Sequence, residues 1–267
     1  MGRLGQRFAT LRARGERALV PFVTAGDPDL ARTEALVLAL VAAGADVIEI
    51  GVPFSDPLAE GPTIQRASER ALRSGTSLRR VLELVKALRA RVDVPLVLMG
   101  YANVFLAMEE ERFAAAAAEV GVDGVIAVDL PPEEGDALFG ALERRGIDPV
   151  LLAAPTTRPE RLERLARETR GFLYYVSLTG VTGARPELAR GIEDAVRRVR
   201  AVSDVPVCVG FGVSTPEHAA RVGRFADGVV VGSALLDRLE RAPSAEAAID
   251  EAMRFAAALK APLRRPR

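Results

Sequence analysis

The chain alternates between short apolar runs and longer amphipathic patterns along its whole length. The apolar runs are rich in Val, Ile and Leu and too continuous for half-exposed strands, so each predicts a strand buried on both faces. Eight such runs occur, at residues 18–26, 45–52, 94–101, 122–130, 148–157, 171–180, 205–213 and 226–236. Patterns of helical period lie between them, several closing at a glycine as a helix C-cap does, at residues 29–44, 77–92, 111–121, 133–146, 158–171 and 192–203.

Eight buried strands alternating with helices favour a parallel (β/α)8 TIM barrel over a doubly wound sheet, which usually has fewer strands. No linker or change of composition divides the chain, so we expect residues 1–267 to form a single domain. Residues 1–18 are predicted to form an extra N-terminal helix over the closed end of the barrel. The basic, proline-interrupted tail at residues 259–267 is expected to fray.

The charge balance and the small number of cysteines and histidines limit the classes of function that this chain can have. Lys and Arg number 36 and Asp and Glu number 36, and this balance does not suggest a nucleic-acid partner. Cys208 and His218 are the only cysteine and the only histidine, so no metal site is expected and carboxylates must carry any chemistry. No segment approaches the roughly 20 apolar residues of a membrane span, so we expect a cytoplasmic chain without a membrane partner.

The chemistry of a TIM barrel lies at the carboxyl ends of its strands. Glu49 stands inside the apolar run at 45–52, where strand alternation turns it toward the barrel interior or its mouth if Val47 and Gly51 share its face. Burial there would raise the pKa of Glu49 and suit it to proton transfer near neutral pH. The alternative is a buried acid satisfied by a neighbouring N–H or cation. Glu60 follows in the loop VPFSDPLAEGPTIQ and can fold back over the same mouth.

Two glycine-bearing turns, GFGVSTPEH and VGSALL, follow the last two predicted strands and lead into helices. The backbone N–H groups of Gly212, Gly232 and Ser233 at these helix N-termini can bind a dianion, which implies a phosphorylated substrate. The alternative is that the glycines only form tight turns. The loop with Thr182 and Gly183 either adds a donor to this phosphate or is only a surface loop.

The segments DVIEIGVPFSDPLAEGPTIQRA, MGYANVF, YYVSLTGVTG, GFGVS and GSAL, in this order, resemble the tryptophan synthase alpha subunit family, and the resemblance runs from about Phe22 to Leu236. It implies a TIM-barrel lyase of tryptophan biosynthesis, which cleaves indole-3-glycerol phosphate to indole and glyceraldehyde 3-phosphate. It also implies that indole passes through a tunnel to a beta subunit in an alpha-beta-beta-alpha complex. The expected cofactor, PLP, belongs to that partner, and none is expected in this chain.

The resemblance also assigns roles to residues. Glu49 is the general acid and base at indole carbon 3 and the side-chain hydroxyl, Glu60 stabilises charge at the indole nitrogen, and Tyr174 lines the same site. The remaining positions fall into an indole slot, a phosphate cradle and a partner contact. They are Phe22, Met99, Tyr101, Ile126 and Phe211 for indole; Thr182, Gly183, Gly212, Gly232 and Ser233, with Phe211 again, for phosphate; and Pro53, Asp56, Pro57, Asn103 and Phe105 for the partner.

One position departs from the family pattern PFSDPLADGP, because this chain has Glu60 where the family has Asp. The extra methylene moves the carboxylate by about a bond length, and a displacement on the order of 1 Å can cost about a hundredfold in rate. Two hypotheses follow. Either the loop accommodates Glu60 in an active lyase, or the chain is catalytically weakened and mainly binds and activates a beta subunit.

Overall fold

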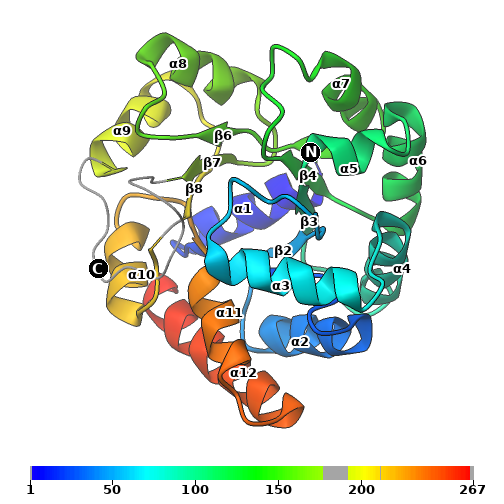
Figure 1. Ribbon diagram of the computed structural model, residues 1–267. Helices are drawn as coiled ribbons and strands as arrows, with labels where there is room; N and C mark the ends of the chain where they lie inside the picture. Colours follow the sequence, from blue (N-terminus) through cyan, green and yellow to red (C-terminus); the bar gives the residue numbers. More distant parts are fainter. Residues whose placement is uncertain (1, 177–191, 211, 265–267) are drawn as a thin grey trace.

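Strands and helices alternate through the computed structural model, which describes residues 2–176, 192–210 and 212–264 (Figure 1). Every predicted apolar run contains a strand, and the fifth run contains two. The strands are β1 (Ala18–Thr24), β2 (Ile48–Gly51), β3 (Leu96–Gly100), β4 (Gly124–Ala127), β5 (Asp148–Pro149), β6 (Leu152–Ala153), β7 (Leu173–Val176), β8 (Val207–Gly210) and β9 (Gly228–Val231).

Most of the helices cover the outside of the strands, and each predicted helical pattern coincides with a helix to within a few residues. They are α1 (Arg3–Ala13), α2 (Leu30–Ala42), α3 (Pro62–Arg73), α4 (Leu78–Arg89), α5 (Ala102–Leu106), α6 (Glu110–Val120), α7 (Asp136–Arg144), α8 (Pro159–Glu168), α9 (Ile192–Val202), α10 (Pro216–Gly223), α11 (Ser233–Glu240) and α12 (Ala245–Lys260), followed by the short 3-10 helix η1 (Ala261–Leu263).

The sheet closes into a barrel through the fifth run. The strand order is β5-β4-β3-β2-β1-β9-β8-β7-β6 with parallel pairing, and β5 and β6, at its two ends, are separated in the chain only by Val150 and Leu151. The N–H of Val150 donates to the carbonyl of Val125 (2.9 Å), and the N–H of Tyr174 donates to the carbonyl of Leu151 (3.0 Å). One continuous segment therefore pairs with β4 through its first half and with β7 through its second, which confirms the predicted TIM barrel.

The strands bury two apolar layers, one on each face. Ile48 and Ile50 of β2 belong to the large core between the strands and the surrounding helices. Val47 belongs to a smaller cluster, with Val20 and Val97, inside the barrel. Because side chains alternate along a strand, Glu49 points to the inside like Val47, as its sequence context predicts.

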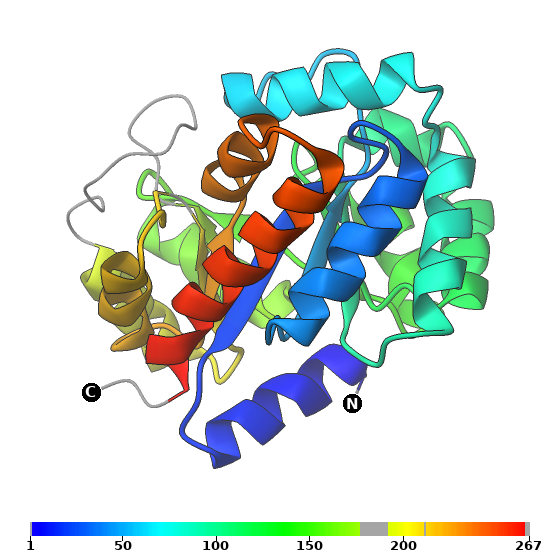
Figure 2. The same cartoon turned by 90° about the horizontal axis from the view of Figure 1, so that it is seen from below.

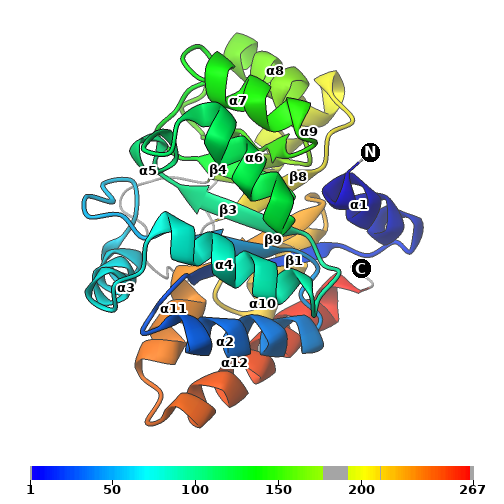
Figure 3. The same ribbon diagram turned by 90° about the vertical axis from the view of Figure 1, so that its right-hand side faces the viewer.

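Helix α1 closes the amino-terminal end of the barrel. Leu4, Phe8 and Leu11 share one face of the helix and pack in the inner cluster, where Phe8 meets Phe172 with ring centroids 5.8 Å apart. Figures 2 and 3 show α1 lying across the end opposite the loop that precedes α3. The predicted N-terminal helix is therefore confirmed, and the strand ends on the other side stay open.

The prediction of a frayed tail is wrong for residues 259–263. Lys260 is buried and its ammonium group donates to the carboxylate of Asp46 (2.8 Å) and to the carbonyl of Arg17 (2.9 Å). Leu263 is completely buried. A buried ammonium group is tolerated when it is paired, so this contact fixes the end of α12 against the barrel.

Candidate active site

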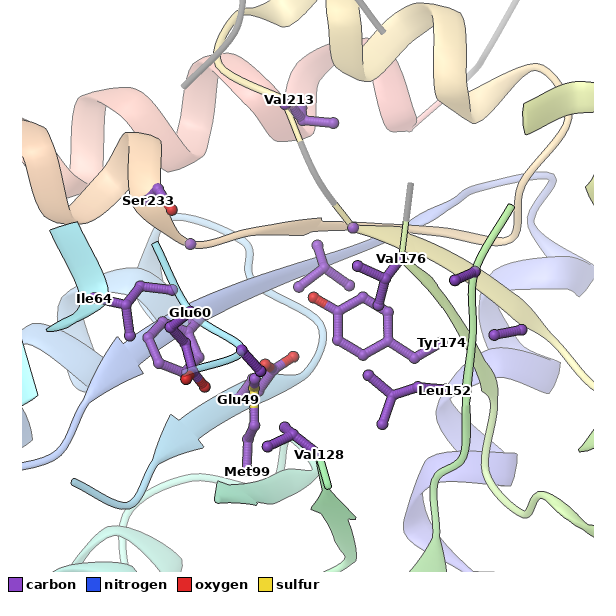
Figure 4. Close-up of a pocket in the computed structure, with 18 of the residues that line it drawn as sticks. Glu49, Glu60, Ile64, Met99, Val128, Leu152, Tyr174, Val176, Val213 and Ser233 are labelled. Atoms are coloured by element: carbon purple, nitrogen blue, oxygen red, sulfur yellow. The ribbon is translucent and has the colours of Figure 1, made fainter. Parts of the chain in front are cut away.

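A cavity of about 280 Å³ opens at the carboxyl ends of the strands (Figure 4). Its wall is mostly apolar, with a few polar groups, as is typical of a small-molecule site. The residues of the wall come from strands all around the barrel and from the loops that follow them. They are Phe22, Glu49, Ala59, Glu60, Ile64, Met99, Val128, Leu152, Ala153, Ala154, Thr157, Tyr174, Val176, Gly210, Gly212, Val213, Val230, Gly232, Ser233 and Ala234.

Glu49 is a buried acid without a hydrogen-bond partner in the described part of the chain. Its side chain faces the cavity from β2 and is 1% exposed, and neither carboxyl oxygen has a hydrogen-bond partner among the described residues. Burial, together with the charge of nearby Glu60, raises the pKa of Glu49 to about 8. The carboxyl group is therefore mostly protonated at pH 7 and can donate a proton into the cavity.

Glu60 reaches the same cavity from the loop between β2 and α3, and Tyr101 holds it there. The phenol of Tyr101 donates a hydrogen bond to Oε2 of Glu60, and the N–H of Ala59 donates to the phenol oxygen (2.8 Å). The ring of Tyr101 stacks on Phe54 with centroids 5.0 Å apart. Tyr101 therefore ties the carboxylate, the backbone and an aromatic side chain of the loop to the end of β3.

The pKa values of the two carboxyl groups differ because different interactions act on each group. Burial raises the pKa of Glu60 to about 7, and the hydrogen bond from Tyr101 opposes that rise. As the pH rises, Glu60 therefore loses its proton at a lower pH than Glu49 does. Paired acids whose pKa values are pushed apart can act as an acid and a base in one site. The arrangement supplies a proton donor and an anion on the same wall of the cavity (Figure 4).

Tyr174 points into the cavity from β7, and burial raises the pKa of its phenol, which stays protonated. Gly210 on β8 makes room for it, because a Cβ atom at that position would lie 2.2 Å from the Tyr174 ring. Sequence reasoning missed Gly210. The signal was present in the sequence, since a glycine inside a strand indicates a close approach to the backbone.

The predicted indole slot is assembled only in part. Phe22 and Met99 line the cavity, whereas Tyr101 stands behind the loop and contacts Glu60. Ile126 is completely buried in the inner cluster and does not belong to the cavity wall, and its role in the indole slot stays a prediction. Val128, two residues nearer the strand end on the same face, lines the cavity where Ile126 does not. Phe211 lies outside the described residues.

Several wall residues that the sequence did not predict come from the ends of β4 and β6. Val128, Leu152 and Ala153 complete the apolar side of the cavity, with Ile64 from the first turn of α3. Whether these side chains reach the cavity depends on the tilt of the strands, and no local sequence pattern encodes that tilt. Only the closed barrel places these aliphatic side chains around the same space.

The predicted phosphate residues Gly212, Gly232 and Ser233 line the same cavity as the two acids. Gly232 is the N-cap of α11, so the free N–H groups of the first helical turn lie at the cavity wall. Thr182 and Gly183 lie outside the described residues, and their part in the cradle stays a prediction. Within the described part, these N–H groups are the feature of the wall best suited to a dianion.

The predicted partner contacts divide into exposed and buried residues. Asp56 and Asn103 are exposed and Pro57 is half-buried, so they form part of the surface around the cavity. Phe105 is completely buried and stacks on Phe113 with ring centroids 4.8 Å apart, and Pro53 is buried too. The side chains of these two residues pack inside the chain, and their part in a partner contact stays a prediction.

Among the described residues, no group of three or more His, Cys, Asp and Glu side chains is placed to hold a metal ion. No helix in that part of the chain is long and apolar enough to cross a membrane.

The barrel and its cavity define a class of protein, a TIM-barrel enzyme whose cavity holds two carboxyl groups of raised pKa and the N-terminus of a helix. The family model described as "Tryptophan synthase alpha chain" matches residues 8–263. This chain therefore belongs to the tryptophan synthase alpha chain family, as its sequence motifs predict. It is a lyase of tryptophan biosynthesis, and its reaction is the cleavage of indole-3-glycerol phosphate.

Individual relatives agree with the family model over nearly the whole chain. The tryptophan synthase alpha chain of Citrifermentans bemidjiense is 55% identical over 260 residues, which cover 97% of each chain. That of Geobacter sulfurreducens is 52% identical over 246 residues, which cover 92% of this chain and 93% of the relative. A solved structure of Mycobacterium tuberculosis tryptophan synthase superposes with a TM-score of 0.91 at 40% identity, over 98% of each chain.

Proposed function

We propose that Glu49 and Glu60 are the acid–base pair with which this chain cleaves indole-3-glycerol phosphate to indole and glyceraldehyde 3-phosphate. The observation that carries the assignment is the pair of buried carboxyl groups, with pKa values raised to about 8 and about 7, on one wall of a cavity whose other end is a helix N-terminus. The loop accommodates the longer Glu60 because Tyr101 receives its carboxylate.

The protons balance with these two groups. Protonated Glu49 donates to carbon 3 of the indole ring, and the carboxylate of Glu60 stabilises the positive charge that this places on the ring N–H. The Glu49 carboxylate then removes the proton of the side-chain hydroxyl next to carbon 3. The carbon–carbon bond breaks, its electron pair returns to the ring to give indole, and the hydroxyl carbon becomes the aldehyde. Glu49 ends the cycle protonated, as it began.

Backbone N–H groups bind the phosphate in this proposal. The dianion lies at the first turn of α11, against Gly232 and Ser233, with Gly212 opposite. The indole ring then lies among the apolar side chains, between Phe22, Met99 and Leu152. Tyr174, with its phenol protonated, closes the slot beside Glu49.

The partner in the proposal is a tryptophan synthase beta subunit, which carries PLP and assembles with this chain as an alpha-beta-beta-alpha heterotetramer. The support is the exposed surface after β2 and β3, where Asp56 and Asn103 are exposed and Leu58, next to Pro57, is 88% exposed. So large an exposed aliphatic side chain beside an active-site loop suits a protein contact.

Turnover of indole-3-glycerol phosphate by the purified chain tests the function. We expect indole release by the chain alone, and faster release when a beta subunit is added. Release only in the presence of the partner would favour the hypothesis of a weakened chain that mainly activates its beta subunit. No release in either condition would refute the proposed function.

Tyr101→Phe is expected to move the pH profile of the reaction. Loss of the phenol removes a hydrogen bond that lowers the pKa of Glu60, so that pKa rises and the ascending limb of kcat/KM shifts to higher pH. Near pH 6.5 the rate falls several-fold, and part of it returns at pH 8. The measurement is kcat/KM from pH 5.5 to 9.

The other titratable groups that face Glu60 are Glu49, Asp129 and Tyr174, and all three are unchanged in this variant. Tyr175→Phe is the matched control, because Tyr175 is buried in the outer core and does not line the cavity. An unshifted profile in Tyr101→Phe would show that the phenol does not control the ionisation of Glu60.

A further inference from the structure

A polar network outside the cavity joins the two helices that begin at its wall. Helices α3 and α11 pack side by side, as Figures 1 and 3 show. Thr63, Arg66 and Arg70 share one face of α3, and Asp237 and Glu240 stand opposite them on α11. Arg66 binds Glu240 through both carboxylate oxygens (3.0 and 2.7 Å), and Arg70 joins Glu240 (2.8 Å) to Asp27 after β1 (2.7 and 2.8 Å).

The link nearest the cavity is also the most buried. The hydroxyl of Thr63 donates to Oδ1 of Asp237 at 2.7 Å, with Thr63 only 6% exposed and the Asp237 side chain 22% exposed. The guanidinium group of Arg66 is farther from Asp237, at 3.9 Å, and is 47% exposed. A short hydrogen bond to an ionised acceptor is stronger and more directional than an exposed ion pair. The Thr63–Asp237 bond is therefore the contact that can fix the two helices relative to each other.

Each helix carries one end of the site. Helix α3 begins two residues after Glu60, and Nε2 of Gln65, in its first turn, donates to the carbonyl of Glu60 (2.9 Å). Helix α11 begins at Ser233, in the proposed phosphate cradle. Thr63 lies three residues after Glu60, and Asp237 lies one helical turn after Ser233. The distance between the acid and the phosphate end thus depends on how these two first turns are held together.

Apolar packing alone does not set that distance. Beneath the network, Ile64 and Ala67 of α3 meet Leu236 of α11 and Phe22 of β1. Aliphatic contacts of this kind tolerate small sliding of one helix along another, whereas a hydrogen bond of 2.7 Å constrains both distance and direction. Shifts on the order of 1 Å matter for a reagent, since they can change a rate about a hundredfold.

We propose that Asp237 is a positioning residue of the reaction: through Thr63 it fixes Glu60 at the distance from the phosphate cradle that the substrate requires. The inference rests on the proposed function of Glu60 and the α11 N-terminus. Asp237 acts on the outside of the cavity wall, where it does not touch the substrate.

The test is a double-mutant cycle. Asp237→Ala and Thr63→Val each remove the hydrogen bond, and each is expected to lower kcat for indole-3-glycerol phosphate about tenfold with KM changed less than threefold, because both ends of the site remain intact. The double variant is expected to lose no more than either single variant. Asp237→Asn retains an acceptor oxygen and is expected to keep at least half of kcat. Arg73→Gln, on an exposed part of α3 where Arg73 contacts only Glu69 among the described residues, is the control without effect.

The outcomes separate this inference from the proposed function. If the wild-type chain releases indole but Asp237→Ala retains full kcat, the apolar cluster alone positions the helices and the inference is wrong. Losses that multiply in the double variant, or a rise in KM without a fall in kcat, overturn it too, because they indicate independent damage to the fold or to the cradle. Absence of turnover in the wild type instead refutes the proposed function.

Discussion

Glu49→Gln is expected to lower kcat for indole release by between about a hundredfold and ten-thousandfold, the range that a general acid–base group contributes. The amide is nearly isosteric with the carboxyl group, so the cavity keeps its shape, but it can neither donate the proton to carbon 3 nor take the hydroxyl proton. The measurement is single-turnover indole release with saturating substrate. Retention of more than a tenth of the rate would remove Glu49 from the chemistry.

The same variant is expected to be more stable than the wild type at alkaline pH, which separates lost chemistry from lost folding. The pKa of Glu49 is about 8 in the folded chain, against an ordinary value of 4.5, so the folded state binds its proton more tightly than the unfolded state does. The free energy of unfolding of the wild type therefore falls as pH rises from about 4.5 through 8. Each unit of such a shift corresponds to about 1.4 kcal/mol, which makes the full difference on the order of 5 kcal/mol.

Glutamine does not titrate, so the advantage of Glu49→Gln should be present at pH 9 and nearly vanish at pH 5. Both neutral side chains leave buried polar atoms without partners to a similar extent, so this cost cancels in the comparison. Urea unfolding at the two pH values measures the difference. Equal stability of variant and wild type at pH 9 would show that Glu49 is not held in an environment that disfavours its charge.

Glu60→Gln is expected to lower kcat by at least about a hundredfold. A neutral amide cannot stabilise the charge that forms at the ring nitrogen. Glu60→Asp is expected to be slower than the wild type by about tenfold, since the shorter side chain withdraws its carboxylate from the phenol of Tyr101. Indole release by both variants, with and without a beta subunit, measures this.

A strong rise in rate on Glu60→Asp would contradict this expectation. It would mean that the loop does not accommodate the longer acid, and it would favour the hypothesis of a weakened chain whose main work is to activate its partner. Retained activity in Glu60→Gln would remove Glu60 from the reaction altogether. The two substitutions thus separate the effect of side-chain length on the rate from the effect of side-chain charge.

For the loop around Glu60, the sequence predicts a place in the site but not the contacts that hold the loop. Its acid, its prolines and its place after a buried strand identify it as part of the site. The phenol of Tyr101, forty-one residues later, donates to the Glu60 carboxylate, and this contact between the loop before α3 and the end of β3 is encoded by no local pattern. Tyr101 was predicted only as a wall of the indole slot, and its hydrogen bond to Glu60 was not predicted.

Ile126, which the family resemblance places in the indole slot, shows the limit of strand alternation as a guide. The alternation of β4 correctly turns this residue inward, but a position on the inner face can lie in the packed centre of a barrel or at its mouth. The depth depends on strand tilt and on how far the neighbouring strands extend. Val128 reaches the cavity and Ile126 does not, which only the assembled barrel decides.

The sequence by itself determined the barrel, the inward face of Glu49 and the glycine turns at the last strand ends, because these depend on period-two and helical patterns that local residues encode. Its motifs also identified the family. The tertiary structure decided which inward residues meet at the cavity, that Phe105 and Lys260 are buried, and that Tyr101 bonds to Glu60 and Thr63 to Asp237. These are contacts between segments far apart in the chain, and their geometry exists only when closure of the sheet brings the strand ends and helix starts together.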